Sequence, residues 1–232
     1  MNIIITGASK GIGFAIAQQF AAHGHDLYLT SKTPADLEKA ATDLRAQFPL
    51  VNIEYFASDL SQKANVDAFS KWCLQKTQAD ILINNAGYFV PGKLMEEAEG
   101  QLQGQLDTNL FSAYHLTRAI LPSMLTKKSG HIFNICSIAS LGAYENGGAY
   151  SISKFALLGF SKNLRLELKD KGIKVTAVCP GAAYTNSWAG SGVDPKRIME
   201  ASDIAKMIYA STQLSNQAVV EDIIMRPQLG DL

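Results

Sequence analysis

Short apolar runs alternate with longer stretches of helical spacing along the whole of this 232-residue chain. A strand buried inside a parallel sheet is a continuous apolar run, whereas a helix on that sheet has apolar residues three and four positions apart. On this basis we predict strands at 2–6, 26–30, 51–57, 79–84, 130–136, 173–178 and 218–224. We predict helices at 11–23, 34–48, 61–77, 97–126, 149–171 and 201–213.

The alternation of strands and helices predicts the class of fold. Parallel strands need a crossover connection, which a helix between two strands supplies. We therefore expect an α/β protein: a single doubly wound Rossmann-type domain over residues 1–232, whose seven-stranded parallel sheet has helices on both faces. Residues 181–198 fit neither pattern, and we expect a substrate-lid loop there, over the carboxyl ends of the strands.

Composition narrows the class of protein. The chain is 47% hydrophobic and 18% charged, as expected of a compact soluble protein, and its net charge of zero does not favour a nucleic-acid partner. The sequence has no apolar run of about 18 residues and no leader-like start, so we expect a cytoplasmic protein without a membrane span. The cysteines (Cys73, Cys136, Cys179) and the histidines lack disulfide or metal-ligand spacing, so we expect reduced thiols and no metal.

The predicted helix 149–171 is apolar in nearly every direction around its axis. Such a helix is buried on more than one side. One side can meet the sheet, and the other meets either a second subunit or neighbours in its own chain. Periodicity does not separate these two alternatives. We favour association into a homodimer or homotetramer.

A glycine-rich turn joins the first predicted strand to the first predicted helix. The residues are Gly7-Ala-Ser-Lys-Gly11-Ile-Gly13, a spacing that is neither the dinucleotide fingerprint G-x-G-x-x-G nor a P-loop. Backbone N–H groups and the dipole at the start of a helix favour a bound pyrophosphate, and glycines allow its close approach. The alternative is an ordinary tight turn.

Tyr150, Lys154 and Ser137 form a second candidate group. Lys154 follows Tyr150 by one helical turn, so its ammonium can stabilise the phenolate and make the tyrosine a proton donor and acceptor near neutral pH. Ser137, from a strand end, could hold a carbonyl oxygen against the phenol. None of these side chains carries a hydride, so a redox reaction here needs a bound cofactor. Taken alone, Tyr-x-x-x-Lys is more often a surface pair.

Together these motifs resemble those of the classical short-chain dehydrogenase/reductase family, in the same order over nearly the whole chain. Asp59 matches the residue that binds adenine in that family. Two departures border the substrate side, a cysteine before Ser137 and the absence of a glycine in residues 138–141, and they bear on the substrate rather than on the reaction. The resembling segments are Thr6–Gly13, Ser58–Leu60, Asn84–Gly87, Asn109, Ser137, Tyr150 with Lys154, and Pro180-Gly181 with Thr185.

The resemblance implies a role for each residue of a catalytic tetrad. Tyr150 exchanges the proton, and Ser137 positions the carbonyl oxygen. Lys154 lowers the pKa of Tyr150 and binds the nicotinamide ribose, while Asn109 holds a water that links Lys154 to solvent. Hydride passes between the nicotinamide and the substrate carbon. The implied cofactor-binding residues are Gly7, Ser9, Lys10, Gly11, Ile12, Gly13, Ser31, Lys32, Asp59, Leu60, Asn85, Ala86, Gly87, Tyr150, Lys154, Pro180, Gly181 and Thr185.

The residues after the second predicted strand favour NADP(H) over NAD(H). A carboxylate at this position binds the ribose hydroxyls of NAD and repels the 2′-phosphate of NADP. This chain has Ser31 and Lys32 there, and Lys10 lies in the glycine turn. Two ammonium groups and a hydroxyl make a suitable phosphate site, although both lysines could instead be solvated surface charges.

The sequence does not identify the substrate. An aromatic and mostly apolar set of candidate pocket residues suits a small-molecule carbonyl or alcohol, such as a hydrophobic ketone or aldehyde or a 3-oxoacyl compound. Two other classes of protein differ from this chain in a recognisable feature. A catalytically silent nucleotide-binding regulator would be expected to lack Tyr150 or Lys154, and both are present. A sugar-nucleotide enzyme would need a larger C-terminal part. The candidate pocket residues are Tyr88, Phe89, Leu141, Tyr144, Tyr184 and Trp188.

Overall fold

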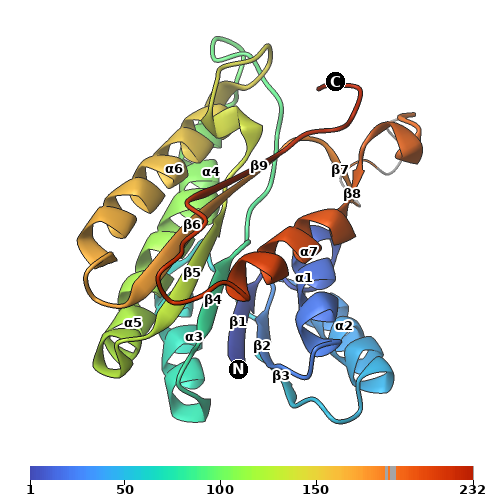
Figure 1. Cartoon of the computed structure of the whole chain (residues 1–232). Coiled ribbons are helices and arrows are strands. Elements are labelled where there is room, and N and C mark those ends of the chain that lie inside the picture. Colours follow the sequence, from blue (N-terminus) through green and yellow to red (C-terminus); the bar gives the residue numbers. More distant parts are fainter. Residues whose placement is uncertain (186–187, 189–191, 232) are drawn as a thin grey trace.

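A seven-stranded parallel sheet forms the centre of the molecule (Figure 1). The computed structural model describes residues 1–185, 188 and 192–231. The strands lie in the order β3-β2-β1-β4-β5-β6-β9, and every neighbouring pair is parallel. The predicted doubly wound α/β fold is thereby confirmed. The strands are β1 (Asn2–Thr6), β2 (Asp26–Thr30), β3 (Ile53–Tyr55), β4 (Ile81–Asn84), β5 (Gly130–Ile135), β6 (Ile173–Pro180) and β9 (Asp222–Met225).

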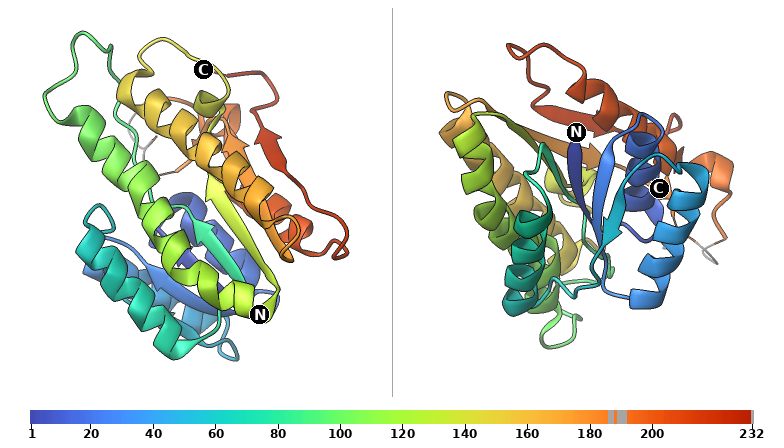
Figure 2. Two further views of the ribbon diagram at one scale, coloured as in Figure 1. Left: turned by 90° about the vertical axis from the view of Figure 1, so that its left-hand side faces the viewer. Right: turned by 90° about the horizontal axis from the view of Figure 1, so that it is seen from below.

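Helices cover both faces of the sheet (Figure 2). On one face lie α1 (Gly11–Ala21), α2 (Pro34–Gln47) and α7 (Ala201–Thr212). On the other lie α3 (Lys63–Lys76), α5 (Ser112–Lys127) and α6 (Gly148–Leu168). Right-handed crossovers between parallel strands place helices on both sides in this way.

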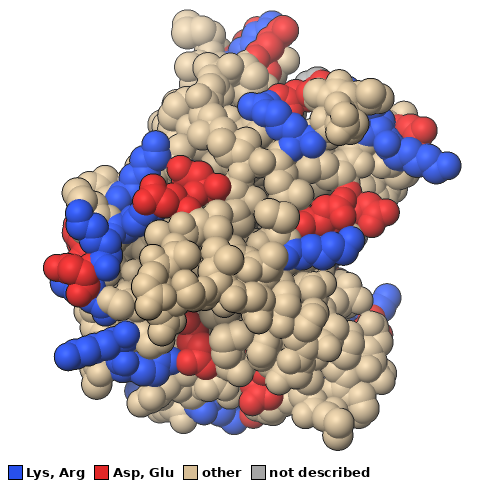
Figure 3. Space-filling view, in the orientation of Figure 1, with Lys and Arg blue, Asp and Glu red and all other residues tan. Residues whose placement is uncertain are grey.

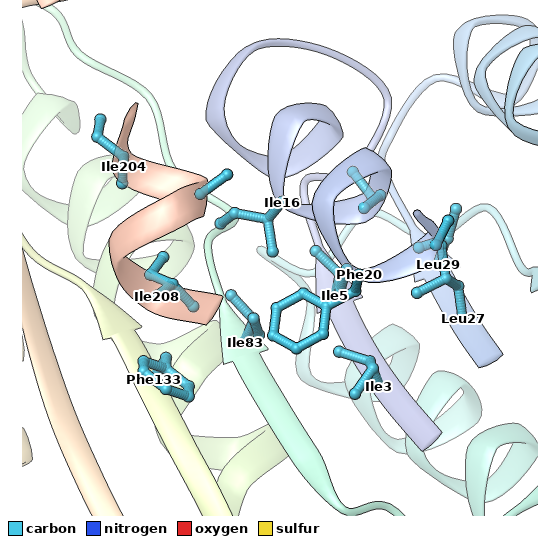
Figure 4. Packing of buried hydrophobic residues seen from close by; sticks show 14 of the residues in the cluster. Ile3, Ile5, Ile16, Phe20, Leu27, Leu29, Ile83, Phe133, Ile204 and Ile208 are labelled. Carbon is cyan, nitrogen blue, oxygen red and sulfur yellow. The ribbon is translucent and has the colours of Figure 1, made fainter. Parts of the chain in front are cut away.

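The two apolar cores follow from the alternation of side chains along each strand. Ile3 and Ile5 of β1 pack with Phe20 of α1 in one core, as Figure 4 shows, whereas Ile4 packs in the opposite core with Phe69 of α3. These five side chains are at most 1% exposed. Every strand inside the sheet must therefore be apolar at successive positions, which is why the strands were recognisable as continuous apolar runs.

Several predicted boundaries differ from the structure. The predicted helix 97–126 begins only at α4 (Gln101–Leu106), because Gly100 has a φ of +83° and interrupts it. It then contains a π-helical turn (Asp107–Phe111) before α5. The outer strands are shorter than predicted, at Ile53–Tyr55 and Asp222–Met225. Edge strands have fewer neighbours to extend their pairing, which fits this shortening.

The predicted lid region 181–198 contains short regular elements. β7 (Ala183–Tyr184) pairs with β8 (Met199–Glu200), and a 3₁₀ turn covers Pro195–Arg197. Residues 186–187 and 189–191 of this prediction lie outside the described residues. The Arg197 guanidinium donates hydrogen bonds to the carbonyls of residues 229–231, so the C-terminal tail is held against this region.

The surface and the helices bear on the kind of protein this is. On the face shown in Figure 3, acidic and basic side chains are interspersed around a broad uncharged area. Among the described residues, no helix has the length and hydrophobicity that a membrane-spanning segment requires. β1 and β4 are neighbours at the point where the strand order reverses. In open α/β sheets, the carboxyl ends of strands at such a point form the usual binding crevice.

Candidate active site

A cavity of about 950 Å³ opens at the carboxyl ends of the strands. It brings together nearly all of the predicted site residues, from the glycine turn to the segment after β6. Gly13 and Asn109 are buried behind its wall instead. The predicted residues that line it are Gly7, Ser9, Lys10, Gly11, Ile12, Ser31, Lys32, Asp59, Leu60, Asn85, Ala86, Gly87, Ser137, Tyr150, Lys154, Pro180, Gly181 and Thr185.

Hydrogen bonds between β1 and the turn after β4 shape the floor of the cavity. Thr6 Oγ1 accepts hydrogen bonds from the backbone N–H groups of Asn85 (2.9 Å) and Ala86 (2.8 Å). Asn85 Nδ2 donates in return to the carbonyls of Thr6 (2.9 Å) and Gly7 (3.1 Å). A Cβ on Gly13 would lie 2.2 Å from the Gly7 carbonyl oxygen. Gly13 therefore permits close packing of the turn on α1 rather than facing a ligand.

The end of β2 presents a hydroxyl without a partner. Ser31 Oγ is buried, and no hydrogen-bond partner for it exists among the described residues. Beside it, Lys32 Nζ lies 2.9 Å from Asp59 Oδ2. Burial opposes ionisation of Asp59, but hydrogen bonds from Lys32 and Ser61 outweigh it and hold the pKa of Asp59 below its ordinary value. A buried hydroxyl normally has a partner, so this corner fits a ligand that supplies an oxygen there.

The first turns of α6 carry Tyr150 and Lys154 toward Ser137, which follows β5. Burial raises the pKa of Tyr150, although its hydrogen bond with Ser137 opposes the rise. Burial also lowers the pKa of Lys154. Lys154 Nζ donates to the Ile135 carbonyl (2.8 Å) and lies 5.7 Å from the centroid of the Tyr150 ring.

The predicted effect of Lys154 on Tyr150 is therefore not seen in this structure. We expected the ammonium to lower the pKa of Tyr150, and the pKa is raised instead. The physical reason is desolvation, because both groups are buried and burial favours the neutral form of each. The engagement of Lys154 with the Ile135 carbonyl adds to this by directing its ammonium to the backbone.

Asn109 is placed by the π-helical turn. The N–H of Ser112 bonds to the carbonyl of Asp107, five residues earlier, which marks the turn. The side chain of Asn109 is 1% exposed. Its Oδ1 accepts from the N–H of Tyr88 (2.9 Å), and its Nδ2 donates to the Tyr88 carbonyl (3.2 Å) and to Ser153 Oγ (2.9 Å). Asn109 thus fixes the start of the loop after β4, a role that the sequence did not indicate.

The substrate side of the cavity is aromatic, as predicted. Tyr88, Phe89, Leu141, Tyr144 and Trp188 line it, and the rings of Phe89 and Tyr150 meet edge to face with their centroids 4.8 Å apart. Tyr184 does not belong to this set, because it lines a separate cavity against α1 and the 3₁₀ turn. β7 pairs with β8, and this pairing directs Tyr184 away from the site.

Sequence reasoning missed part of the lining. Arg226 and Asp231 come from the C-terminal tail, which no motif distinguishes, and they form an ion pair at the rim. The Gly181 N–H donates a hydrogen bond to the Met225 carbonyl (2.7 Å). This contact holds the C-terminal tail beside the cavity and so brings Arg226 and Asp231 to it. The lining residues absent from the prediction also include Thr33, Asp36, Ser58, Thr108, Ile135, Cys136, Ile138, Ala139, Gly142, Ala143, Ala182 and Ala183.

The glycine turn, the cavity and the Ser137, Tyr150 and Lys154 group define an oxidoreductase of the nucleotide-binding α/β type. Residues 1–195 match the family model for short chain dehydrogenases. The chain is 35% identical to a sepiapterin reductase of Chlorobaculum tepidum, over 99% of this chain and 97% of that protein. It belongs to the short-chain dehydrogenase family, and it is an NAD(P)-dependent oxidoreductase.

Solved structures agree with this assignment. An alcohol dehydrogenase from Thermococcus sibiricus, complexed with 5-hydroxy-NADP, superposes with a TM-score of 0.91 at 27% identity, over 100% of this chain and 98% of that one. An L-sorbose reductase from Gluconobacter frateurii, complexed with NADPH and L-sorbose, gives a TM-score of 0.87 at 27% identity, over 97% and 94%. Several relatives of this fold therefore bind NADP or NADPH.

Proposed function

We propose that this protein reduces a small-molecule carbonyl compound, or oxidises the corresponding alcohol, with NADP(H). The observation that carries the proposal is the convergence of Ser137, Tyr150 and Lys154 on the cavity into which the glycine turn opens. The residues present fit a dinucleotide. α1 begins at Gly11 without a side-chain cap, so its first N–H groups are available to a phosphate, and Ser31 offers its unpartnered hydroxyl.

Each residue of the group has a chemical task in this proposal. The nicotinamide, when bound, supplies or accepts the hydride. In the direction of reduction, Tyr150 gives its phenolic proton to the carbonyl oxygen, which Ser137 Oγ holds in place by a hydrogen bond. Lys154 binds ribose hydroxyls and supplies positive charge as the phenolate forms. Asn109 keeps Tyr88 in position, and it holds a water that links Lys154 to solvent so that the proton is replaced.

The substrate we propose is a hydrophobic or aromatic ketone or aldehyde. Aromatic rings and Leu141 line this side of the cavity, and the neighbouring carbonyl-binding group supplies the polar contact. The named relative is a sepiapterin reductase, so a bicyclic heteroaromatic carbonyl compound is a suitable first candidate. A 3-oxoacyl compound is the second candidate, because it carries a ketone on an apolar chain that suits the same lining.

The cofactor we propose is NADP(H) rather than NAD(H). Lys10, Ser31 and Lys32 lie on the cavity wall, and no carboxylate follows β2 directly. Lys32 is paired with Asp59, and both side chains are partly exposed. A surface pair of this kind is weak, so a phosphate can compete for the ammonium.

We also propose association into a homodimer or homotetramer through α5 and α6. Ile152, Phe155, Gly159 and Leu166 form an exposed stripe along α6, and Leu166 is 63% exposed. The space in front of Gly159 is open, so a second helix could approach the stripe closely. Exposed apolar patches of this kind mark interfaces.

Replacing Tyr150 by phenylalanine tests the reaction. The change keeps the ring against Phe89 and removes the proton donor, so we expect NADPH oxidation to fall by about 10²–10⁴-fold while NADPH still binds. The assay is loss of NADPH absorbance over a panel of sepiapterin, hydrophobic ketones, aldehydes and 3-oxoacyl thioesters. Tyr209→Phe, on α7 outside the cavity, removes a phenolic hydroxyl while the ring keeps its contact with Phe20. It is the matched control and should stay within a few-fold of wild type. Wild-type protein that binds NADPH and reduces no compound would instead indicate a silent regulator.

The pH dependence tests the proton donor separately. Reduction consumes the proton of neutral Tyr150, and burial raises its pKa above the ordinary value of about 10. The neutral form therefore persists through neutral pH, and we expect kcat/KM for reduction to remain constant to about pH 9 and to fall only beyond it. Oxidation of the alcohol needs the phenolate and should become faster over the same range. A decline in reduction that begins near pH 7 would contradict this assignment.

Charge reversal at Lys32 tests cofactor choice. We expect wild type to prefer NADPH to NADH in kcat/KM. Lys32→Asp should lower that preference about tenfold or more, since hydrogen bonds to charged groups contribute about 1.5–3 kcal/mol. Lys39→Asp on the exposed face of α2 makes the same charge change away from the cavity and should leave the preference unaltered. An unchanged preference in Lys32→Asp would overturn the role of Lys32.

Light scattering tests association. We expect the purified protein at micromolar concentration to have the mass of a dimer or tetramer. Phe155→Glu places a charge in the stripe on α6 and should yield monomers. Leu50→Glu, at a side chain that is 99% exposed between α2 and β3, is the matched control and should not change the mass. A monomeric wild type would refute the proposal.

A further inference from the structure

The loop after β4 and the start of α6 are joined by a carboxylate. Glu97, in the turn before α4, directs Oε1 to the backbone N–H of Ala149, 2.7 Å away. Close by, the N–H of Gly92 donates to the carbonyl of Asn146 (3.0 Å). Figure 1 shows the two segments side by side beyond the carboxyl ends of the strands. Residues far apart in the sequence are thus fastened together next to the cavity.

The Glu97 carboxylate packs against the backbone of two glycines. Gly148 has a φ of +40°, and a Cβ there would lie 2.1 Å from Glu97 Oε1 and 2.5 Å from the Gly92 carbonyl oxygen. Gly92 lies on the other side of Glu97, where a Cβ would be 3.1 Å from Glu97 Cγ. Only glycine at position 148 leaves room for the carboxylate. The contact is therefore shaped by the residues on both sides of it.

In the part of the chain that the structure describes, no other side chain caps α6 at this end. Its N-cap residue is Gly147, which has no side chain to accept a hydrogen bond from the first turn. The first N–H groups of a helix need acceptors from outside it, and a negative charge there is favoured by the helix dipole. Glu97 provides an acceptor and a carboxylate at the start of α6. Tyr150 is the next residue after the Ala149 amide that Glu97 binds.

We propose that Glu97 is a positioning residue for Tyr150: by holding the first turn of α6 against the loop after β4, it fixes the phenol relative to Ser137 and the substrate. The same loop carries Phe89, whose ring packs on that of Tyr150 with a centroid distance of 4.8 Å. The loop itself is held at its start by Asn109. The consequence for catalysis rests on the proposed function, whereas the contact with α6 does not.

Hydrogen exchange measures the contact without any need for turnover. We expect Glu97→Ala to increase deuterium uptake in a peptide that covers residues 144–154, whereas a peptide covering the glycine turn, 3–14, stays unchanged. Glu97→Gln keeps an acceptor oxygen and should behave almost as wild type. Glu96→Ala is the matched control, because Glu96 is exposed and forms a surface ion pair with Lys93. Equal uptake in wild type and Glu97→Ala would overturn the proposal, as would faster exchange in both peptides.

Kinetics with the compound that wild type reduces best then test the effect on Tyr150. We expect Glu97→Ala to lower kcat by about tenfold or more, since a small misplacement of a catalytic group can cost about 10²-fold. The dissociation constant of NADPH, measured by fluorescence, should remain within about twofold of wild type, because the glycine turn and the end of β2, where we propose that the phosphates bind, lie away from Glu97. Glu97→Gln should restore most of kcat. A kcat that survives in Glu97→Ala, or a loss of NADPH binding together with kcat, would refute the positioning role. If wild type reduces no compound, the proposed function fails, and the exchange experiment alone decides whether Glu97 holds this turn.

Discussion

The cavity depends on the hydrogen bonds that Thr6 and Asn85 exchange across the ends of β1 and β4. These strands are neighbours at the point where the strand order reverses, so the chain leaves them in opposite directions and a crevice must open between the two exits. Thr6 Oγ1 satisfies two N–H groups of the turn after β4, and Asn85 satisfies two carbonyls of the turn after β1. Backbone groups that would otherwise be left without partners are paired within the floor, and the glycine turn remains free to face a ligand.

Burial determines the electrostatics of the catalytic group. Tyr150 is kept neutral by desolvation, and the charge on Lys154 is disfavoured by the same cause. A neutral phenol is the form that reduction needs, so burial favours the proton donor rather than the proton acceptor. In the proposed reaction, burial therefore supplies the form of Tyr150 that reduction consumes. The burial results from the packing of the first turns of α6 against the end of β5.

The sequence predicted the sheet and most of the residues that we assigned to the cavity, because both arise from local patterns. The apolar runs gave the strands of the interior, and Tyr150 with Lys154 needed only one helical turn to come together. Predictions were poorer wherever the outcome depended on tertiary contacts. The π-helical turn at Asn109 and the approach of Arg226 and Asp231 have no local signature. The raised pKa of Tyr150 also could not be read from spacing, because it depends on how much water the fold excludes.

Like the hydrogen bond between Glu97 and α6, the π-helical turn positions one side chain beside the cavity, in this case that of Asn109. A π turn contains one residue more than an α-helical turn, and residues in an α-helix are separated by about 100° around the axis. Removing Thr108 or Leu110 would restore the regular α-helical turn and shift Asn109 around the helix axis. Asn109 would then turn away from Tyr88, even though no site residue had been exchanged. In this stretch the number of residues is as much a part of the active site as their identity, so an alignment that shifts by one position here would misassign the site.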